Sequence, residues 1–353
     1  MIDAMSTAGR TGRCAGALKA RPGRLSGSIL GLALPLVVMV PVALPAESAG
    51  LPLTEVARLT LPGPSNRFDY QSVDPGAHRL YISHMDADRL LEVDTRRREV
   101  IRLIPAPGVH GVLAVPEIDR VFASATNARQ VITIDAGTGT VIAKAPAGQY
   151  PDGIAWDPAD RRAFVSDEAG GTETVVDAHG RRVDTVKLGG EAGNVQYDAG
   201  SGHVLVDVQA NDEVAVIDPR KGRVVERVPL AGCDHDHGLL IDSPHRLAFI
   251  ACDRSATLLT LDLTTMKVIG SATVGPAPDV LAFDPSLRRL YVAAESGVVA
   301  IFEEADHGLR KLGQALLAPY AHTVAVDPVT HLVYFPLQSG SSGRPQLLIM
   351  RPT

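Results

Sequence analysis

The sequence has few cysteines and lacks the short motifs that mark several large enzyme classes. Of its 353 residues only three are cysteine, and none stands at the end of the N-terminal apolar run, where a lipid would be attached. No nucleophile elbow, Walker loop, dinucleotide fingerprint or HExxH motif occurs in a supporting context. The sequence therefore gives no direct assignment to the enzymes that carry those motifs.

Positive charge is concentrated at the N-terminus. Five basic residues precede the apolar run "SILGLALPLVVMVPVAL", and small residues follow near Ala46. This order is typical of a secretory signal peptide, which we predict over residues 1–46. The run is short and contains Pro35 and Pro41, so we expect no stable membrane insertion after cleavage. The mature protein is expected to be periplasmic or secreted.

The remaining chain is acidic. Residues 1–46 carry five basic residues and one acidic residue, so their removal leaves 29 basic and 39 acidic residues and a net charge of −10. A surface of that sign repels nucleic acid and anionic lipid, and we expect neither as a partner. Cys233 and Cys252 are the only cysteines left, and in an oxidising compartment such a pair is expected to form a disulfide.

A repeat of about 42 residues runs through the rest of the chain. Aligned units begin 41 to 44 residues apart, at Asp69, His110, Asp152, Gly193, His237, Asp279 and His322. Twelve residues after each start stands a large apolar residue: Tyr81, Phe122, Phe164, Leu205, Phe249, Tyr291 and Tyr334. Agreement at fixed spacing in seven units indicates one structural element repeated seven times.

Each unit reads as four short strands separated by turns rich in Gly, Pro, Asp and Asn, and no long amphipathic helix is indicated. The pattern predicts an all-β, seven-bladed β-propeller with four-stranded antiparallel blades, forming a single domain over residues 47–353. The last unit has only three strands. A strand at about residues 54–61 has the fourth-strand pattern, so we expect it to complete the last blade and close the ring.

The segments "YISHMDADRLLEVD", "FASATNARQVITID" and "LVDVQANDEVAVID" resemble the YVTN-type repeat. With its export signal, the architecture resembles the bacterial YncE-like propellers over residues 51–353. The resemblance implies the propeller fold. It does not imply one reaction, because related propellers share blades rather than chemistry, so function has to be argued from a site.

The repeat sorts the histidines by position. His78, His203, His245 and His331 fall in the turn after the inner strand, where we expect their rings in solvent. His110, His237 and His322 stand at inner-strand starts, a position that other units fill with Asp69, Asp152 and Asp279. His84 is expected to begin the loop after the second strand of the first unit, and because that strand runs antiparallel to the inner strand, its end returns to the same end of the ring. These side chains are predicted to gather at one mouth of the central channel.

Two interpretations of this mouth remain open. It is the polar rim of a scaffold that binds a small molecule or an exported protein, or it is a metal-dependent hydrolase or lyase site. For binding, the candidate residues are Arg67, Asp69, Tyr150, Asp152, His237, Asp279 and Tyr320. For one divalent transition metal, the candidate ligands are His84, His110, His322 and Asp69, from adjacent blades. His235 receives no role, and we expect a monomer.

Overall fold

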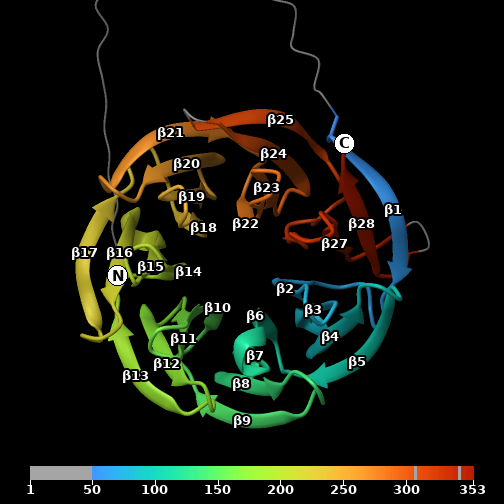
Figure 1. Ribbon diagram of the computed structural model, residues 1–353, viewed down its shortest axis with the longest axis horizontal. Coiled ribbons are helices and arrows are strands. Elements are labelled where there is room, and N and C mark those ends of the chain that lie inside the picture. Colours follow the sequence, from blue (N-terminus) through green and yellow to red (C-terminus); the bar gives the residue numbers. More distant parts are fainter. Residues whose placement is uncertain (1–49, 306–307, 341–342) are drawn as a thin grey trace, which may run out of the picture. The chain divides into compact units, whose positions relative to one another are not determined.

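The chain forms a seven-bladed β-propeller (Figure 1). The computed structural model describes residues 50–305, 308–340 and 343–353, and over these residues seven four-stranded antiparallel sheets surround a central axis. The predicted fold is confirmed. The predicted signal peptide, residues 1–46, lies outside the described residues and stays a prediction.

The strands follow one another outward in each blade. The inner strands are β2 (Gln71–Asp74), β6 (Val109–Val115), β10 (Pro151–Asp157), β14 (Ala192–Asp198), β18 (Asp236–Asp242), β22 (Pro278–Asp284) and β26 (Ala325–Val326). The second strands are β3 (Arg79–His84), β7 (Arg120–Ala125), β11 (Arg162–Asp167), β15 (His203–Val208), β19 (Leu247–Cys252), β23 (Arg289–Ala294) and β27 (Val333–Leu337). The third strands are β4 (Arg89–Asp94), β8 (Gln130–Asp135), β12 (Thr172–Asp177), β16 (Glu213–Asp218), β20 (Thr257–Asp262), β24 (Val298–Ala305) and β28 (Gln346–Pro352). The outer strands are β5 (Glu99–Pro105), β9 (Val141–Pro146), β13 (Arg182–Lys187), β17 (Arg223–Pro229), β21 (Lys267–Thr273), β25 (Gly308–Leu316) and β1 (Leu53–Thr60). Short 3-10 turns are η1 (Met85–Ala87), η2 (Pro116–Ile118), η3 (Thr126–Ala128) and η4 (Gln209–Asn211).

The core lies between the blades. Second and third strands such as β3 and β4 are buried on both faces, because each blade is covered by a neighbour on either side. The outer strand β21 instead alternates exposed and half-buried residues, as a strand at the rim should. The seven repeated large apolar residues, from Tyr81 to Tyr334, are each at most 1% exposed. They fill the inter-blade core, which explains their fixed spacing.

An aspartate at the end of the third strand also recurs from blade to blade, and it stabilises the turn between the third and the outer strand. The Oδ1 atom of Asp94 accepts hydrogen bonds from the backbone N–H groups of Arg96 and Arg97. Equivalent bonds form at Asp135, Asp177, Asp218 and Asp262. A carboxylate that caps its own turn in this way is the usual reason for aspartate at such positions.

The ring is closed by the N-terminal strand. β1 pairs antiparallel with β28, from Leu53 opposite Pro352 to Thr60 opposite Gln346. In Figure 1 the blue β1 lies along the red β28 beside the C-terminus. The observed strand begins one residue earlier than predicted, and the closure itself agrees with the sequence.

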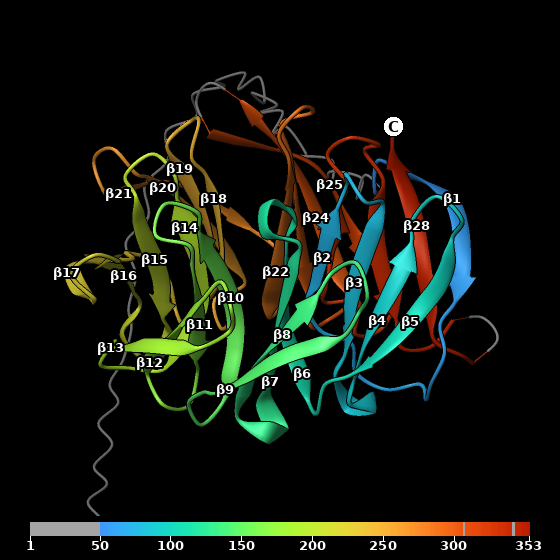
Figure 2. The same cartoon turned by 60° about the horizontal axis from the view of Figure 1, so that its bottom comes forward.

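All inner strands cross the ring in the same direction, so their first residues meet at one end and the following turns meet at the other (Figure 2). This arrangement positions the site described next. Among the described residues, no helix has the length and apolar character needed to span a membrane.

Candidate binding cavity at one end of the ring

A cavity of about 410 Å³ lies at the end of the ring where the inner strands begin. Two positions of the repeat supply most of its wall: the start of each inner strand, and the first residue after each second strand. The lining residues are Arg67, Asp69, Tyr70, Met85, His110, Tyr150, Asp152, Glu168, His237, Asp253, Ala277, Pro278, Asp279 and Glu295. They come from blades one, two, three, five and six.

Asp279 joins two histidines from neighbouring blades. Its Oδ1 lies 3.1 Å from Nε2 of His237, and its Oδ2 lies 2.6 Å from Nδ1 of His322. Nε2 of His322 donates to the carbonyl oxygen of Phe68 at 2.9 Å. A carbonyl only accepts, so both ring nitrogens of His322 are donors and the ring is an imidazolium.

The pKa values agree with this charge pattern. Burial disfavours the charged forms of these three groups, but the hydrogen bonds and charges among them outweigh burial. The pKa of Asp279 is therefore lowered, that of His322 is raised, and that of His237 is raised to about 10. The cluster carries two positive charges around one carboxylate.

Arg67, the other cation of the wall, is also paired. Its Nη2 lies 2.6 Å from Glu295, and its Nε lies 3.7 Å from Asp69. Glu295 further lies 3.6 Å from Nδ1 of His322. These contacts link the arginine to the histidine cluster and satisfy its charge within the protein.

The carboxyl groups of blade three are less well paired. Asp152 is 3% exposed, and its Oδ1 accepts no hydrogen bond from any residue that the structure describes. Burial, opposed by His110 and reinforced by Asp69, raises the pKa of Asp152 to about 7. Burial is also the main cause that raises the pKa of Glu168 and of Asp69. The charged forms of these carboxyl groups are therefore disfavoured by burial, and a cation beside them would stabilise those forms.

His110 lies between these groups. Its Nδ1 donates to the carbonyl oxygen of Gly108 at 2.9 Å, and its Nε2 lies 2.8 Å from the hydroxyl of Tyr150. In the neutral ring, Nε2 therefore accepts the tyrosine proton. The bond to Gly108 fixes the His110 ring, and the bond to Tyr150 holds the tyrosine ring 4.9 Å from it in the cavity wall.

Six of the seven residues predicted for ligand binding line this cavity. The seventh, Tyr320, does not line it and is 59% exposed. His235, which received no role, is buried outside the cavity, and its Nδ1 lies 3.0 Å from Asp253.

The four predicted metal ligands do not converge. No three of His84, His110, His322 and Asp69 offer ligand atoms within 4.8 Å of one another. His84 stacks on the ring of Phe68 at 4.1 Å, and its Nε2 donates to Asn66 at 2.6 Å. As the last residue of β3, it packs against the loop before β2 instead of lining the cavity. His322 uses both ring nitrogens as donors, as described above.

Other ligand atoms do lie close together at this end of the ring. Asp279, Glu295 and His322 offer ligand atoms within 4.8 Å, but those atoms are already bonded to His237, Arg67 and one another. In this group both oxygens of Asp279 and both ring nitrogens of His322 are already bonded, so a metal would have to break those bonds.

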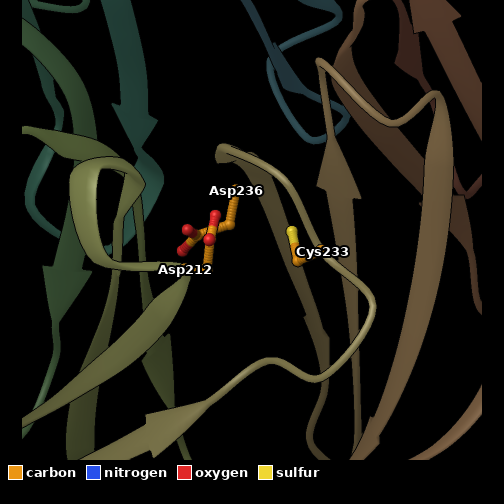
Figure 3. Close-up of side chains that lie close together, drawn as sticks. All are labelled: Asp212, Cys233 and Asp236. Atoms are coloured by element: carbon orange, nitrogen blue, oxygen red, sulfur yellow. The ribbon is translucent and has the colours of Figure 1, made fainter.

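Asp212, Cys233 and Asp236 form a second close group (Figure 3). Figure 3 shows the two carboxylates facing each other, with the sulfur of Cys233 on the neighbouring loop. That sulfur is bonded to Cys252 in the predicted disulfide, which the structure contains with 5.4 Å between the Cα atoms. A disulfide sulfur is not a thiolate, so this group lacks its third ligand.

Sequence reasoning missed the residues that follow the second strands. Glu168 follows β11, Asp253 follows β19 and Glu295 follows β23, and all three line the cavity with Met85, which follows β3. The repeat contained the signal, because these residues share one aligned position. The prediction chose His84, one residue earlier, and one step along a strand turns the side chain to the opposite face.

Comparison with known proteins supports the fold and gives no activity. No family model matches the sequence. Two curated proteins named "Uncharacterized protein YncE", from Salmonella typhi and Salmonella typhimurium (strain LT2), are each 31% identical over 104 residues. That region covers 30% of this chain and 30% of each relative, so the chain is similar to YncE over part of its length.

Solved structures match over most of the ring. A chain of Kuenenia stuttgartiensis hydrazine synthase has a TM-score of 0.67 at 14% identity, covering 79% of this chain and 94% of that one. A chain of the mitotic checkpoint complex has a TM-score of 0.72 at 12% identity, covering 90% and 98%. At such low identity these likenesses show the propeller fold alone.

Proposed function

We propose that this protein is an exported, YncE-like binding propeller of the YVTN-repeat type, and that its mouth cavity holds a small organic cation such as an amine. One observation carries the proposal. The carboxyl of Asp152 is buried in the cavity wall, and its Oδ1 accepts no hydrogen bond from the described residues. A buried acceptor in this state is stabilised by a ligand that donates to it.

The charges around the cavity favour a cation over an anion. Arg67 and His237 already bond to Glu295 and Asp279. Burial is the largest cause of the raised pKa values of Asp152 and Glu168, so their charged forms are disfavoured unless a further cation lies beside them. An ammonium group would pair with these carboxylates, whereas an anion would have to break an existing ion pair.

The geometry favours an organic cation over a metal ion. Asp69, Asp152 and Glu168 do not form a group of ligand atoms within 4.8 Å. The rings of Tyr70 and Tyr150 also line the space, and aromatic faces attract organic ammonium groups. The volume of about 410 Å³ is in the usual range for small-molecule pockets.

Export is supported by the predicted signal peptide and by the Cys233–Cys252 disulfide, which persists in oxidising compartments. The alternative of a metal-dependent hydrolase or lyase has less support, because its predicted ligands His84, His110, His322 and Asp69 do not converge.

Isothermal titration calorimetry of the purified protein at pH 8 tests the proposal. The ligands are a panel of primary and quaternary amines, with neutral alcohols and carboxylates of similar size. We expect amines to bind and Asp152→Asn to weaken binding roughly 10- to 100-fold, the value of one charge-assisted hydrogen bond. Binding should also fall as the pH drops below about 7, because Asp152 becomes protonated while an alkylamine stays charged.

The matched control is Asp160→Asn, which changes a partly exposed aspartate of the same blade outside the cavity and should leave binding unchanged. Selective binding of the carboxylates, or amine binding that Asp152→Asn leaves intact, would reject the proposal.

A further inference from the structure

A histidine and two carboxylates meet at the opposite end of the ring from the cavity. Asp242 is the last residue of β18 in blade five, and His245 stands in the turn that follows it. Glu304 lies near the end of β24 in blade six. Although 59 residues separate His245 from Glu304 in sequence, the three side chains offer ligand atoms within 4.8 Å of one another.

The imidazole faces both carboxylates through one nitrogen. Nδ1 of His245 lies 2.7 Å from Oδ2 of Asp242 and 3.5 Å from Oε1 of Glu304. The side chains of Asp242 and Glu304 are 4% and 2% exposed, whereas that of His245 is 48% exposed. The carboxylates are therefore held in place by the fold, and the histidine covers them from the solvent side.

One carboxylate oxygen of this group has no hydrogen-bond partner among the described residues. Oε2 of Glu304 is buried and accepts no hydrogen bond from the described residues. Ligand atoms of Asp242 and Glu304 lie within 4.8 Å of each other and of His245. Arg288 lies 3.4 Å from Oε1 of Glu304 and also has other interactions. A divalent cation between the two carboxylates would give Oε2 of Glu304 the partner that it lacks among the described residues.

Another histidine–aspartate pair at this end of the ring offers a comparison. Nδ1 of His331, in blade seven, lies 2.7 Å from Oδ2 of Asp284, the last residue of β22 in blade six, which is the distance found in the His245–Asp242 pair. Within the described residues, that pair has no third ligand atom close by. Glu304 is what distinguishes the His245 turn.

We propose that Asp242, His245 and Glu304 bind one divalent transition-metal ion of the Zn²⁺ type, which joins blade five to blade six. Imidazole and carboxylate are ligands that Zn²⁺ prefers, and the imidazole disfavours Ca²⁺ and Mg²⁺. The ion takes the place of the proton on Nδ1 of His245, which is released to solvent. Water completes the coordination on the exposed side.

Calorimetric titration of tag-free, chelator-stripped full-length protein with ZnCl₂ at pH 7 tests this assignment. We expect one equivalent to bind with micromolar or tighter affinity. His245→Gln, a change at a half-exposed side chain, should weaken binding at least roughly tenfold. The matched variant His331→Gln should bind as the unchanged protein does. Zn²⁺ should also raise the melting temperature of the protein and of His331→Gln, and not that of His245→Gln.

Two results would overturn the proposal. One is no saturable Zn²⁺ binding by the unchanged protein. The other is binding that survives His245→Gln and is lost in Glu295→Gln, which would place the ion with Asp279 and His322 at the cavity instead. Because neither Asp242 nor Glu304 lines that cavity, the result is independent of amine binding there.

Discussion

At the scale of single residues, Asp279 has the largest electrostatic role in the cavity wall. It is the shared partner of two imidazolium rings, and both rings are buried or nearly so. Removing this carboxylate leaves two largely desolvated positive charges without the acceptor that both bond to, which costs more than the hydrogen bonds alone.

Asp279→Asn should therefore destabilise the protein by about 2 to 4 kcal/mol at pH 7, measured by urea denaturation.

The pH dependence of the protein's stability also has a defined sign. The pKa of His237 is raised from 6.5 to about 10, so its contribution is full below about 6.5 and is lost as pH rises through about 10. That loss of stability toward pH 10 should be much smaller in Asp279→Asn. If Asp284→Asn, whose histidine partner is partly exposed, destabilises the protein at pH 7 as much as Asp279→Asn does, the buried charges are not the cause.

Single residues also show how much of the candidate site could be predicted from the sequence. Aligning the repeats placed Asp152, His237 and Asp279 at one end of the ring, where the structure has them. It could not show that His322 points away from the cavity to the backbone of Phe68, because that contact joins residues 254 positions apart. The sequence predicted that the ring of His245 lies in solvent. This is true only in part, because Nδ1 of His245 lies 3.5 Å from the carboxylate of Glu304 in the next blade.

At the scale of elements, periodicity predicted nearly every strand, whereas loops were harder to place. Strands buried on both faces, such as β7 and β19, read as short continuous apolar runs between turn signals. The loop before β18 has no such pattern. Its course depends on the disulfide, which ties Cys233 to Cys252 at the end of β19.

We expect this disulfide to stabilise the fold by about 3 kcal/mol, because it closes a short loop and restricts the unfolded chain. The cysteines are 19 residues apart. Denaturant unfolding of the paired variant Cys233→Ser/Cys252→Ser should show that loss, and added reductant should affect only the unchanged protein. Alkylation of both cysteines without reductant would contradict the bond itself.

At the scale of the whole molecule, the fold was predictable because seven copies of one pattern reinforce each other. A single unit of four short strands has ambiguous signals, but errors at one strand are corrected by its six counterparts. Site chemistry has no such redundancy. Each blade places a different residue at the mouth, for example Asp152, His237 and Asp279, so each contact depends on one packing detail.

Ring closure gives the last prediction. Blade seven takes its outer strand, β1, from the first residues that the structure describes, and the backbone N–H of Thr353 donates to the carbonyl of Pro52 at 3.1 Å, so the start of β1 and the last residue of the chain meet there. Deleting residues 50–61 exposes the edge of β28 and removes seven paired positions. This deletion should lower the free energy of unfolding by more than about 5 kcal/mol and promote aggregation.

A permuted chain provides the control. Moving the same residues behind Thr353 through a glycine-rich linker restores the four-stranded sheet, but β1 then no longer joins the last blade to the first through the chain. Chromatography and thermal unfolding should then find a soluble monomer that melts between the deletion variant and the unchanged protein. If the permuted chain is as stable as the unchanged protein, β1 acts only by covering the edge of β28, and the joining of the ends contributes nothing.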